Sequence, residues 1–208
     1  MDAHRSPVRR EWSRIKDGER AAQLAEFAVA LPLLIVFVVG IFDFSGAFTL
    51  KQKLTNVARD AARAAAADPF NDVGQPSAAV PASVADAYQL IDNYLVANKI
   101  NECGMNAASF VFSSPSTWRY SASSNGCPGS GLTIVINRGF YFPLNGISQP
   151  PDVTCAPSTV SGQTAVIGTC VSIRYGYQWK FGRVASLLGS SPVLPGTISA
   201  TAVTLNEN

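Results

Sequence analysis

The chain has 208 residues, which suffices for one domain of ordinary size plus an extension rather than for two independent cores. Charged residues make up 14% of it, against roughly 25% in soluble globular domains, and this deficit indicates a membrane-embedded or extracytoplasmic protein. The net charge is only +2, which argues against nucleic-acid binding because that class needs a concentrated basic surface.

Residues 1–21 are predicted to form a short cytoplasmic leader. They are polar and have no apolar period, and their basic residues precede an apolar run that begins near Leu24. These basic residues are Arg5, Arg9, Arg10, Arg14, Lys16 and Arg20. Because Lys and Arg next to a spanning helix set its orientation, the cluster predicts an N-terminus in the cytoplasm.

The apolar run predicts a membrane-spanning segment over about residues 24–50. No charged residue occurs from Phe27 to Phe42, and the apolar character resumes after Asp43 as far as Leu50. At about 1.5 Å per residue, a helix of this length crosses a bilayer core of roughly 30 Å. Asp43 is expected near the outer interface, and everything after Leu50 is expected outside the cytoplasm.

The same helix is predicted to continue out of the membrane, so that it covers residues 22–68 in all. One face repeats apolar residues at helical spacing, and charged residues lie off that face. The apolar positions are Leu50, Leu54, Val57, Ala61 and Ala64. Asp68 and Pro69 end the helix, since the residue before a proline is pushed out of the helical region.

Residues 69–82 are rich in Pro, Gly, Ser and Ala and predict a linker. Ser83 then precedes apolar residues at helical spacing, with Asp86 near the start, so a second helix is predicted from Ser83 to about Asn98. Residues 83–208 are expected to form the extracytoplasmic domain.

Beyond the second helix, β-branched and aromatic residues between turn-forming residues predict strands. The clearest strand is 172–181, where apolar and polar residues alternate and so give one buried and one wet face. Further strands are predicted at 132–137 and 198–205, with a weaker one at 109–112. We therefore expect an α+β fold, in which the long N-terminal helix packs on a small antiparallel sheet of three or four strands, as in pilins, with the second helix and disulfide-bonded loops.

The cysteines agree with an exported domain. All four lie after the apolar run, at Cys103, Cys127, Cys155 and Cys170. Their even number and long spacings favour two disulfides over a zinc site, which would bring cysteines close in sequence. Four cysteines allow three pairings, and the spacings do not choose among them.

Several short motifs occur together within residues 20–66. They are E-F at Glu26 and Phe27, L-P at Leu31 and Pro32, G-I-F-D-F at 40–44, and A-R-D-A-A-R at 58–63. In combination they resemble the TadE-like family of tight-adherence pilus assembly, and I-S-A-T-A-V at 198–203 is similar to the way these proteins end.

The resemblance implies a pseudopilin that prepilin peptidase cuts on the cytoplasmic side of the membrane. Such chains have Glu at the fifth position after the cut, so Glu26 implies cleavage between Ala21 and Ala22, with Phe27 following the glutamate. The sequence departs from the pattern at Ala21, because a glycine normally precedes the cut and Gly18 lies too early. A chain that is not cut would remain an anchor in the inner membrane.

The implied function is that of a minor pilin or pseudopilin in assembly of a tight-adherence, type IV-like pilus. Its partners would be prepilin peptidase, other pilins and the inner-membrane assembly platform, and its apolar helix would pack laterally in the membrane through Leu31, Pro32, Val36 and Val39. The C-terminal domain is expected in the periplasm or outside the cell. No nucleic acid, metal or cofactor is expected.

Glu26 has a physical interpretation that does not depend on the family. A carboxylate at the edge of a spanning helix is costly, by about 2.5 to 3.5 kcal/mol at the bilayer centre and less near the interface, so it normally has a partner. A free α-amino group at Ala22 of a neighbouring subunit is one candidate partner. The alternative is that Glu26 lies among lipid headgroups.

Two other functions compete with a pilus subunit. An ordinary secretory signal, with Ser45 and Ala47 before the cut and an N-terminus near Phe48, would give a secreted binding module. An enzyme on a membrane anchor is not expected, because His4 is the only histidine and the carboxylates after the membrane are scattered. The aromatic series Tyr175, Tyr177 and Trp179 is interpreted as core rather than as a carbohydrate platform, and the Gly-rich segment 126–131 as a loop held by a disulfide at Cys127.

Overall fold

The computed structural model describes residues 8–69, 80–105, 111–114, 116–143, 154–156, 165–186 and 193–207. The chain divides into two compact units. One comprises Met1–Phe44 with Lys180–Val193, and the other comprises Ser45–Trp179 with Leu194–Asn208. The part of the predicted linker between residues 70 and 79, the start of the weak strand at 109–110 and residue 208 lie outside the described residues.

A single long helix, α1, runs from Val8 to Ala67 and contains Pro32. Its end agrees with the stop predicted at Asp68 and Pro69. Its beginning lies inside the segment assigned to the leader, which has no apolar period. The leader is nevertheless rich in Glu, Arg, Lys and Ala, and the intrinsic preference of these residues for helix gives the reason for the earlier start.

The second helix, α2, covers Ala82–Ala97, close to the predicted bounds. It begins one residue before the predicted start at Ser83. Pro81 occupies the N-cap position without a side-chain hydrogen bond, and Ser83 is buried within the first turn. Proline suits a helix start because its fixed φ is compatible with the helix and its missing N–H is not needed there.

The sheet is an antiparallel meander of five strands in the order β1-β2-β3-β4-β5, one or two more than expected. The strands are β1 (Val111–Ser114), β2 (Thr117–Ala122), β3 (Leu132–Pro143), β4 (Ala165–Gly176) and β5 (Thr197–Leu205). The predictions at 132–137 and 198–205 are confirmed within β3 and β5. Strand β2 was not predicted, because Thr117, Arg119 and Ser121 reduce its apolar signal.

The strand predicted at 172–181 is only partly correct. Strand β4 begins earlier, at Ala165, and ends at Gly176, and a short helix α3 occupies Phe181–Ser186. The alternation beyond Gly176 therefore does not mark a strand. Tyr177 and Trp179 are partly buried, their rings meet edge to face at 4.9 Å, and both pack against the main core.

Strand register explains why one face of the sheet is apolar. Trp118, Ile136, Val171 and Ala202 are neighbours across four strands, and the rows above repeat this pattern. The buried side chains of the next rows are Tyr120, Ile134, Ile173, Ala200, Leu132, Tyr175 and Ile198. The alternate positions are largely polar and include Arg119, Ser121, Thr133 and Arg174, so the predicted wet face is present.

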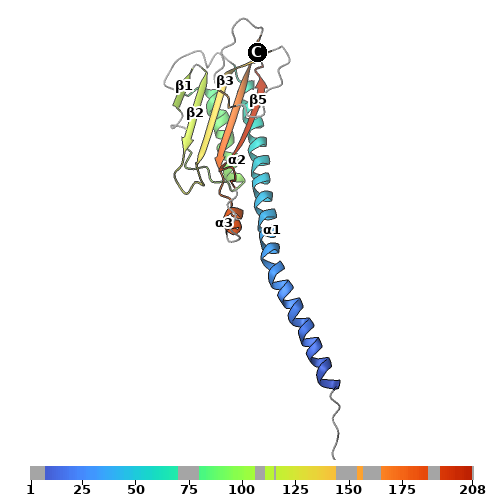
Figure 1. Cartoon of the computed structure of the whole chain (residues 1–208). Helices are drawn as coiled ribbons and strands as arrows, with labels where there is room; N and C mark the ends of the chain where they lie inside the picture. The colour runs from blue at the N-terminus through green and yellow to red at the C-terminus, as the bar shows by residue number, and fades with distance from the viewer. Residues whose placement is uncertain are drawn as a thin grey trace, which may run out of the picture. The chain divides into compact units, whose positions relative to one another are not determined.

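Both helices of this unit contribute to the core on the apolar face, where Figure 1 draws α2 and the C-terminal half of α1 on the same side of the sheet. Helix α1 presents a stripe of small residues with no exposed surface, namely Val57, Ala58, Ala61, Ala62 and Ala65, next to the larger Leu54. Small side chains let a helix backbone approach its neighbours closely. Of the predicted stripe, Leu50 and Ala64 are only partly buried.

Two disulfides are present, Cys103–Cys127 and Cys155–Cys170, and the second attaches Cys155 to strand β4. The first joins the segment after α2 to the loop between β2 and β3, and its Cα atoms are 5.1 Å apart. The loop is therefore held by a disulfide as expected. Gly131 in this loop has φ +83°, and a Cβ there would collide with the Ala122 carbonyl, so only glycine fits.

The two edges of the sheet differ. Strand β1 has four residues and a register shift between Phe112 and Ser114. Strand β5 is longer, and Lys51 of α1 donates a hydrogen bond from Nζ to the carbonyl oxygen of Ser199 in that strand.

Candidate functional site

The N-terminal part of α1 carries a large exposed apolar surface. Within the described residues, Ala22–Ala67 is the one helix long and apolar enough to cross a membrane. Only 6% of its most apolar stretch of 18 residues is buried. Phe27, Phe37 and Phe42 have exposed fractions of 61%, 66% and 75%. The core helix of a soluble domain would be mostly buried, so this surface indicates membrane anchoring.

One stripe of the same segment is less exposed. Val36 and Val39 are partly buried, and Gly40 and Asp43 are buried, at spacings that place them on one side of the helix. Leu31 and Pro32 are exposed. Of the four residues predicted to pack in the membrane, Leu31 and Pro32 are therefore more accessible to a neighbour than Val36 and Val39.

The predicted processing residues lie on the exposed first part of this segment. Ala22, Glu26 and Phe27 are exposed and helical, and Ala21 is within α1. The exposed position of Glu26 is compatible with both interpretations of that carboxylate, an interaction with another subunit or a position among headgroups.

Asp43 makes a specific contact at the other end of the apolar segment. It is 7% exposed, and its Oδ2 atom accepts a hydrogen bond of 2.8 Å from the backbone N–H of Phe181, the first residue of α3. A Cβ at Gly40 would lie 3.2 Å from the Phe181 ring, so the absence of a side chain there permits the close approach. The rings of Phe44 and Phe181 are 6.2 Å apart.

Sequence reasoning did not predict this contact, although a signal for it existed. Asp43 is the one charged residue between Phe27 and Leu50, and a carboxylate in such a position needs a hydrogen-bond partner. Its partner is a backbone amide more than a hundred residues away, which no local pattern identifies.

A buried arginine organises the end of α1. Arg138 has no exposed surface, and its Nη2 atom donates to the carbonyl oxygens of Asp68, at 2.8 Å, and Pro69, at 3.3 Å. Its Nη1 atom is 3.4 Å from Thr169 Oγ1, which in turn donates to Asn206 Oδ1 at 2.6 Å. A cation at the C-terminal end of a helix is favourable because carbonyl groups there lack helical partners. Sequence reasoning missed Arg138, although an arginine in an otherwise apolar strand was a usable signal.

Tyrosines and a carboxylate share a second polar region between α2 and the sheet. Burial, and secondarily the charge of Glu102, raises the pKa of Asp92. Burial also raises the pKa of Tyr88 and of Tyr120, and the charge of Asp92 adds to both effects. The Tyr175 hydroxyl donates to the Asn101 carbonyl oxygen at 3.0 Å. This hydrogen bond holds the loop that follows α2 against strand β4 of the sheet.

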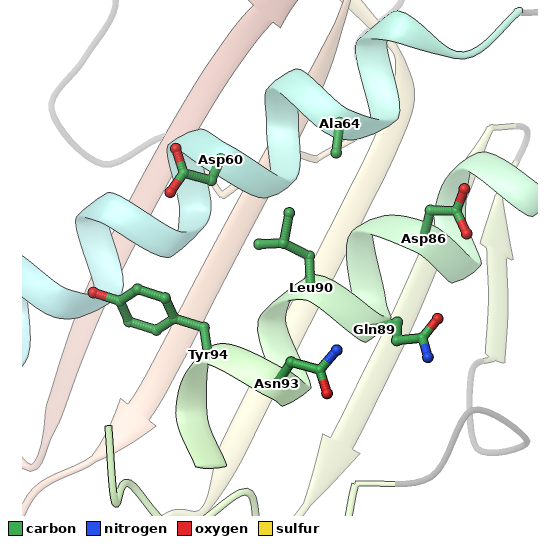
Figure 2. A pocket seen from close by; sticks show the side chains of 7 residues that line it. All are labelled: Asp60, Ala64, Asp86, Gln89, Leu90, Asn93 and Tyr94. Carbon is green, nitrogen blue, oxygen red and sulfur yellow. The ribbon is translucent and has the colours of Figure 1, made fainter. Parts of the chain in front are cut away.

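An open groove runs between α1 and α2 (Figure 2). Leu90 lies between the helices in this view, Asp60 comes from α1, and Asp86 and Asn93 come from α2. The remaining lining residues are Ala64, Gln89 and Tyr94. In the part of the chain that the structure describes, no group of three or more His, Cys, Asp or Glu residues is placed to hold a metal ion.

Comparison with known proteins finds a family match that covers the apolar part of α1. Residues 21–63 match a family model described as TadE-like protein, which agrees with the resemblance of residues 20–66. No curated protein and no solved structure matches the chain. The matched residues contain the exposed apolar segment, the predicted processing residues and Asp43, but not the sheet.

Proposed function

We propose that this TadE-like chain is a minor pilin or pseudopilin that takes part in assembly of a tight-adherence type pilus. The observation that supports the proposal is that the residues of the family match, 21–63, are also those that give α1 its exposed apolar surface. In the proposed role the chain is a structural subunit rather than an enzyme. Its apolar helix packs laterally against other pilins and the assembly platform.

The proposed topology has the N-terminus in the cytoplasm, α1 in the inner membrane and the sheet domain in the periplasm or on the cell surface. The basic residues before the apolar run support this orientation. The two disulfides support it as well, because such bonds persist in oxidising compartments outside the cytoplasm.

Prepilin peptidase is the proposed processing enzyme, with cleavage between Ala21 and Ala22. N-terminal mass spectrometry of the membrane-isolated protein, from cells with and without the peptidase, tests this step. We expect a chain that begins at Ala22 only where the peptidase is present. An intact N-terminus in both strains would mean a permanent anchor, and a start near Phe48 would support the secreted binding module instead.

Glu26 is proposed to pair with the α-amino group of Ala22 on a neighbouring subunit. Glu26→Ala should leave membrane insertion intact, because it removes a charge from an apolar helix, and should reduce pilus output severalfold by removing the partner of that amine. Pilus yield by shearing and immunoblotting measures the effect. Gln52→Ala, which removes an exposed polar side chain farther along the same helix, is the control and should leave the yield unchanged. Normal pilus output from Glu26→Ala would refute the pairing.

A further inference from the structure

Asp43 lies close to the level at which α1 should leave the outer side of the membrane, provided that α1 spans the bilayer as proposed. A bilayer core of roughly 30 Å needs about 20 helical residues at about 1.5 Å each. A span that begins at Leu24, after the last basic residue of the leader, then ends close to Asp43 and Phe44. Gly40 is still within the outer leaflet.

Helix α3 is attached at this level of α1. The Phe181 N–H donates to Asp43 Oδ2 at 2.8 Å, and the Phe181 ring lies against Gly40. Phe44 adds a second aromatic contact. Gly40, Asp43, Phe44 and Phe181 belong to the same compact unit, so the contact between α1 and α3 lies within that unit. Whatever surrounds α1 at Gly40 and Asp43 must therefore also surround the start of α3.

The composition of this segment suits the boundary between headgroups and acyl chains. Lys180 is exposed and begins the segment, Phe181 follows it, and Arg183 lies within α3. Lys and Arg side chains at such a boundary keep their apolar stems along the acyl chains while their charged groups reach the headgroups, and the ring of Phe181 is apolar.

Asp43 gives a reason for the arrangement. A carboxylate at the edge of the apolar core is costly when it loses water, and a hydrogen bond from a backbone amide offsets part of that cost. The same hydrogen bond satisfies an N–H group at the start of α3 that has no partner within the helix. The carboxylate thus gains a hydrogen-bond donor, and the N–H group gains an acceptor, in a region with little water.

We propose that residues 180–186 form a second membrane contact, which lies in the headgroup region of the outer leaflet and is held against the spanning helix by Asp43. The partner is a phospholipid surface, chosen over another protein because the segment continues the surface of a helix that is itself proposed to be in lipid. This inference rests on the proposed membrane insertion of α1.

Tryptophan fluorescence in bilayers that contain brominated phosphatidylcholine tests the contact. The full-length protein is reconstituted as a series of variants, each with one tryptophan, in which Trp12, Trp118 and Trp179 are replaced by Phe where they are not the probe. Phe181→Trp and Ser186→Trp place the probe at the two ends of α3. Phe37→Trp reports on the span, and native Trp118 reports on the sheet.

The bromines are placed either near the headgroup end of the acyl chains or near their methyl end. For a probe in α3 we expect headgroup-end bromines to quench about half of the fluorescence or more, and methyl-end bromines to quench less, because an interfacial helix lies only about 5–10 Å deep. The Phe37→Trp probe should respond best to methyl-end bromines, and Trp118 should respond to neither.

The controls separate the two proposals. Quenching of Phe37→Trp without quenching of either α3 probe would overturn the lipid contact while leaving the spanning helix intact, and would point to a protein partner at α3. Loss of quenching at Phe37→Trp would overturn membrane insertion itself. Quenching at Ser186→Trp alone would still support the contact, since Phe181→Trp alters the packing on Gly40.

The role of Asp43 is tested in the Ser186→Trp background. Asp43→Ala removes the acceptor for the Phe181 N–H, and we expect it to reduce quenching at residue 186 at least about twofold by releasing α3 from the boundary. Gln52→Ala, at an exposed position on the same helix, is the control and should have no effect. Unchanged quenching in Asp43→Ala would show that lipid, rather than Asp43, holds α3, and would overturn that part of the inference.

Discussion

Arg138 is the side chain on which the junction of α1 with the sheet most depends. It is fully buried and donates to two carbonyl groups that follow α1, while its own carbonyl oxygen accepts a hydrogen bond of 3.1 Å from Asn206 Nδ2. The register shift between Asn137 and Phe140 in β3 places Arg138 at an irregular point of the strand, and bulges of this kind redirect a side chain. One residue thus joins α1, β3, β4 and the end of the chain.

Replacing this arginine should be strongly destabilising. Arg138→Ala leaves the Asp68 and Pro69 carbonyls and the Thr169 hydroxyl without their donor and opens a cavity, so we expect a loss of about 3 kcal/mol or more in the free energy of unfolding. Urea unfolding of the oxidised protein in detergent, followed by tryptophan fluorescence, measures it. Arg174→Ala, on the exposed face of β4, should cost no more than about 0.5 kcal/mol. Equal effects of the two variants would contradict this role.

Asp92 should make stability depend on pH. Its pKa is raised by burial and by Glu102, so the folded protein binds the Asp92 proton more tightly than the unfolded chain does. This contribution is fully present below the ordinary aspartate pKa of about 3.9 and is lost as the pH rises through the raised value. Asp92→Asn should therefore raise the melting temperature at neutral pH relative to the original protein.

The pH series itself provides the check on Asp92. The difference in melting temperature between Asp92→Asn and the original protein should shrink as the pH falls towards the ordinary aspartate pKa, where the original carboxyl is also neutral. Asp86→Asn, at an exposed position on the same helix, should leave the melting temperature almost unchanged across the series. A constant difference for Asp92→Asn would mean that its charge is not involved.

Among the elements, those with a strong period were predictable and those defined by distant contacts were not. The apolar stripe of α1, the bounds of α2 and the alternation in β3 and β5 follow from local sequence. Strand β2 and helix α3 do not, because β2 has a polar alternate face, and α3 is only six residues long and its first residue is hydrogen-bonded to the distant Asp43. The alternation of aromatic residues at 177–181 resembled a strand, yet residues 177–180 form an irregular segment that leads into α3.

The small residues of α1 set the distance between this helix and the core. Ala61 has no exposed surface, so Ala61→Leu adds volume where there is no space and should cost about 1–3 kcal/mol. Ala67→Leu, at the exposed last position of the same helix, adds the same atoms in solvent and should be nearly neutral. Thermal unfolding monitored by circular dichroism compares them. An Ala61→Leu protein as stable as the original would show that the packing yields easily.

For the molecule as a whole, the sequence predicted the class of the fold and the exposed helix better than it predicted the site. The α+β arrangement, the membrane segment and the presence of disulfides follow from composition, length and cysteine position. The pairing of Cys103 with Cys127 and of Cys155 with Cys170 required the three-dimensional structure, since spacing alone leaves three pairings. Arg138 and Asp43 also needed it, because the partners of both lie far away in the sequence.

The disulfides should contribute a substantial part of the stability of the sheet domain. Cys103–Cys127 closes a sequence separation of 24 residues, and the Cys103→Ser, Cys127→Ser protein should lose about 3 to 4 kcal/mol by the chain-entropy model. Urea unfolding with and without a thiol reductant measures the loss. Reduction of the original protein should lower its stability further than reduction of the variant lowers its own. A reductant-insensitive unfolding curve for the original protein would contradict the prediction.

The edges of the sheet restrict how copies of the domain can associate. A long, flat and unprotected edge invites another chain to add a strand, which is the usual route to cross-β aggregates. Here one edge is the short and irregular β1, and α1 places the ammonium group of Lys51 at the other. Both are devices that discourage strand addition. Copies of this domain at high local concentration are therefore not expected to polymerise through their sheets.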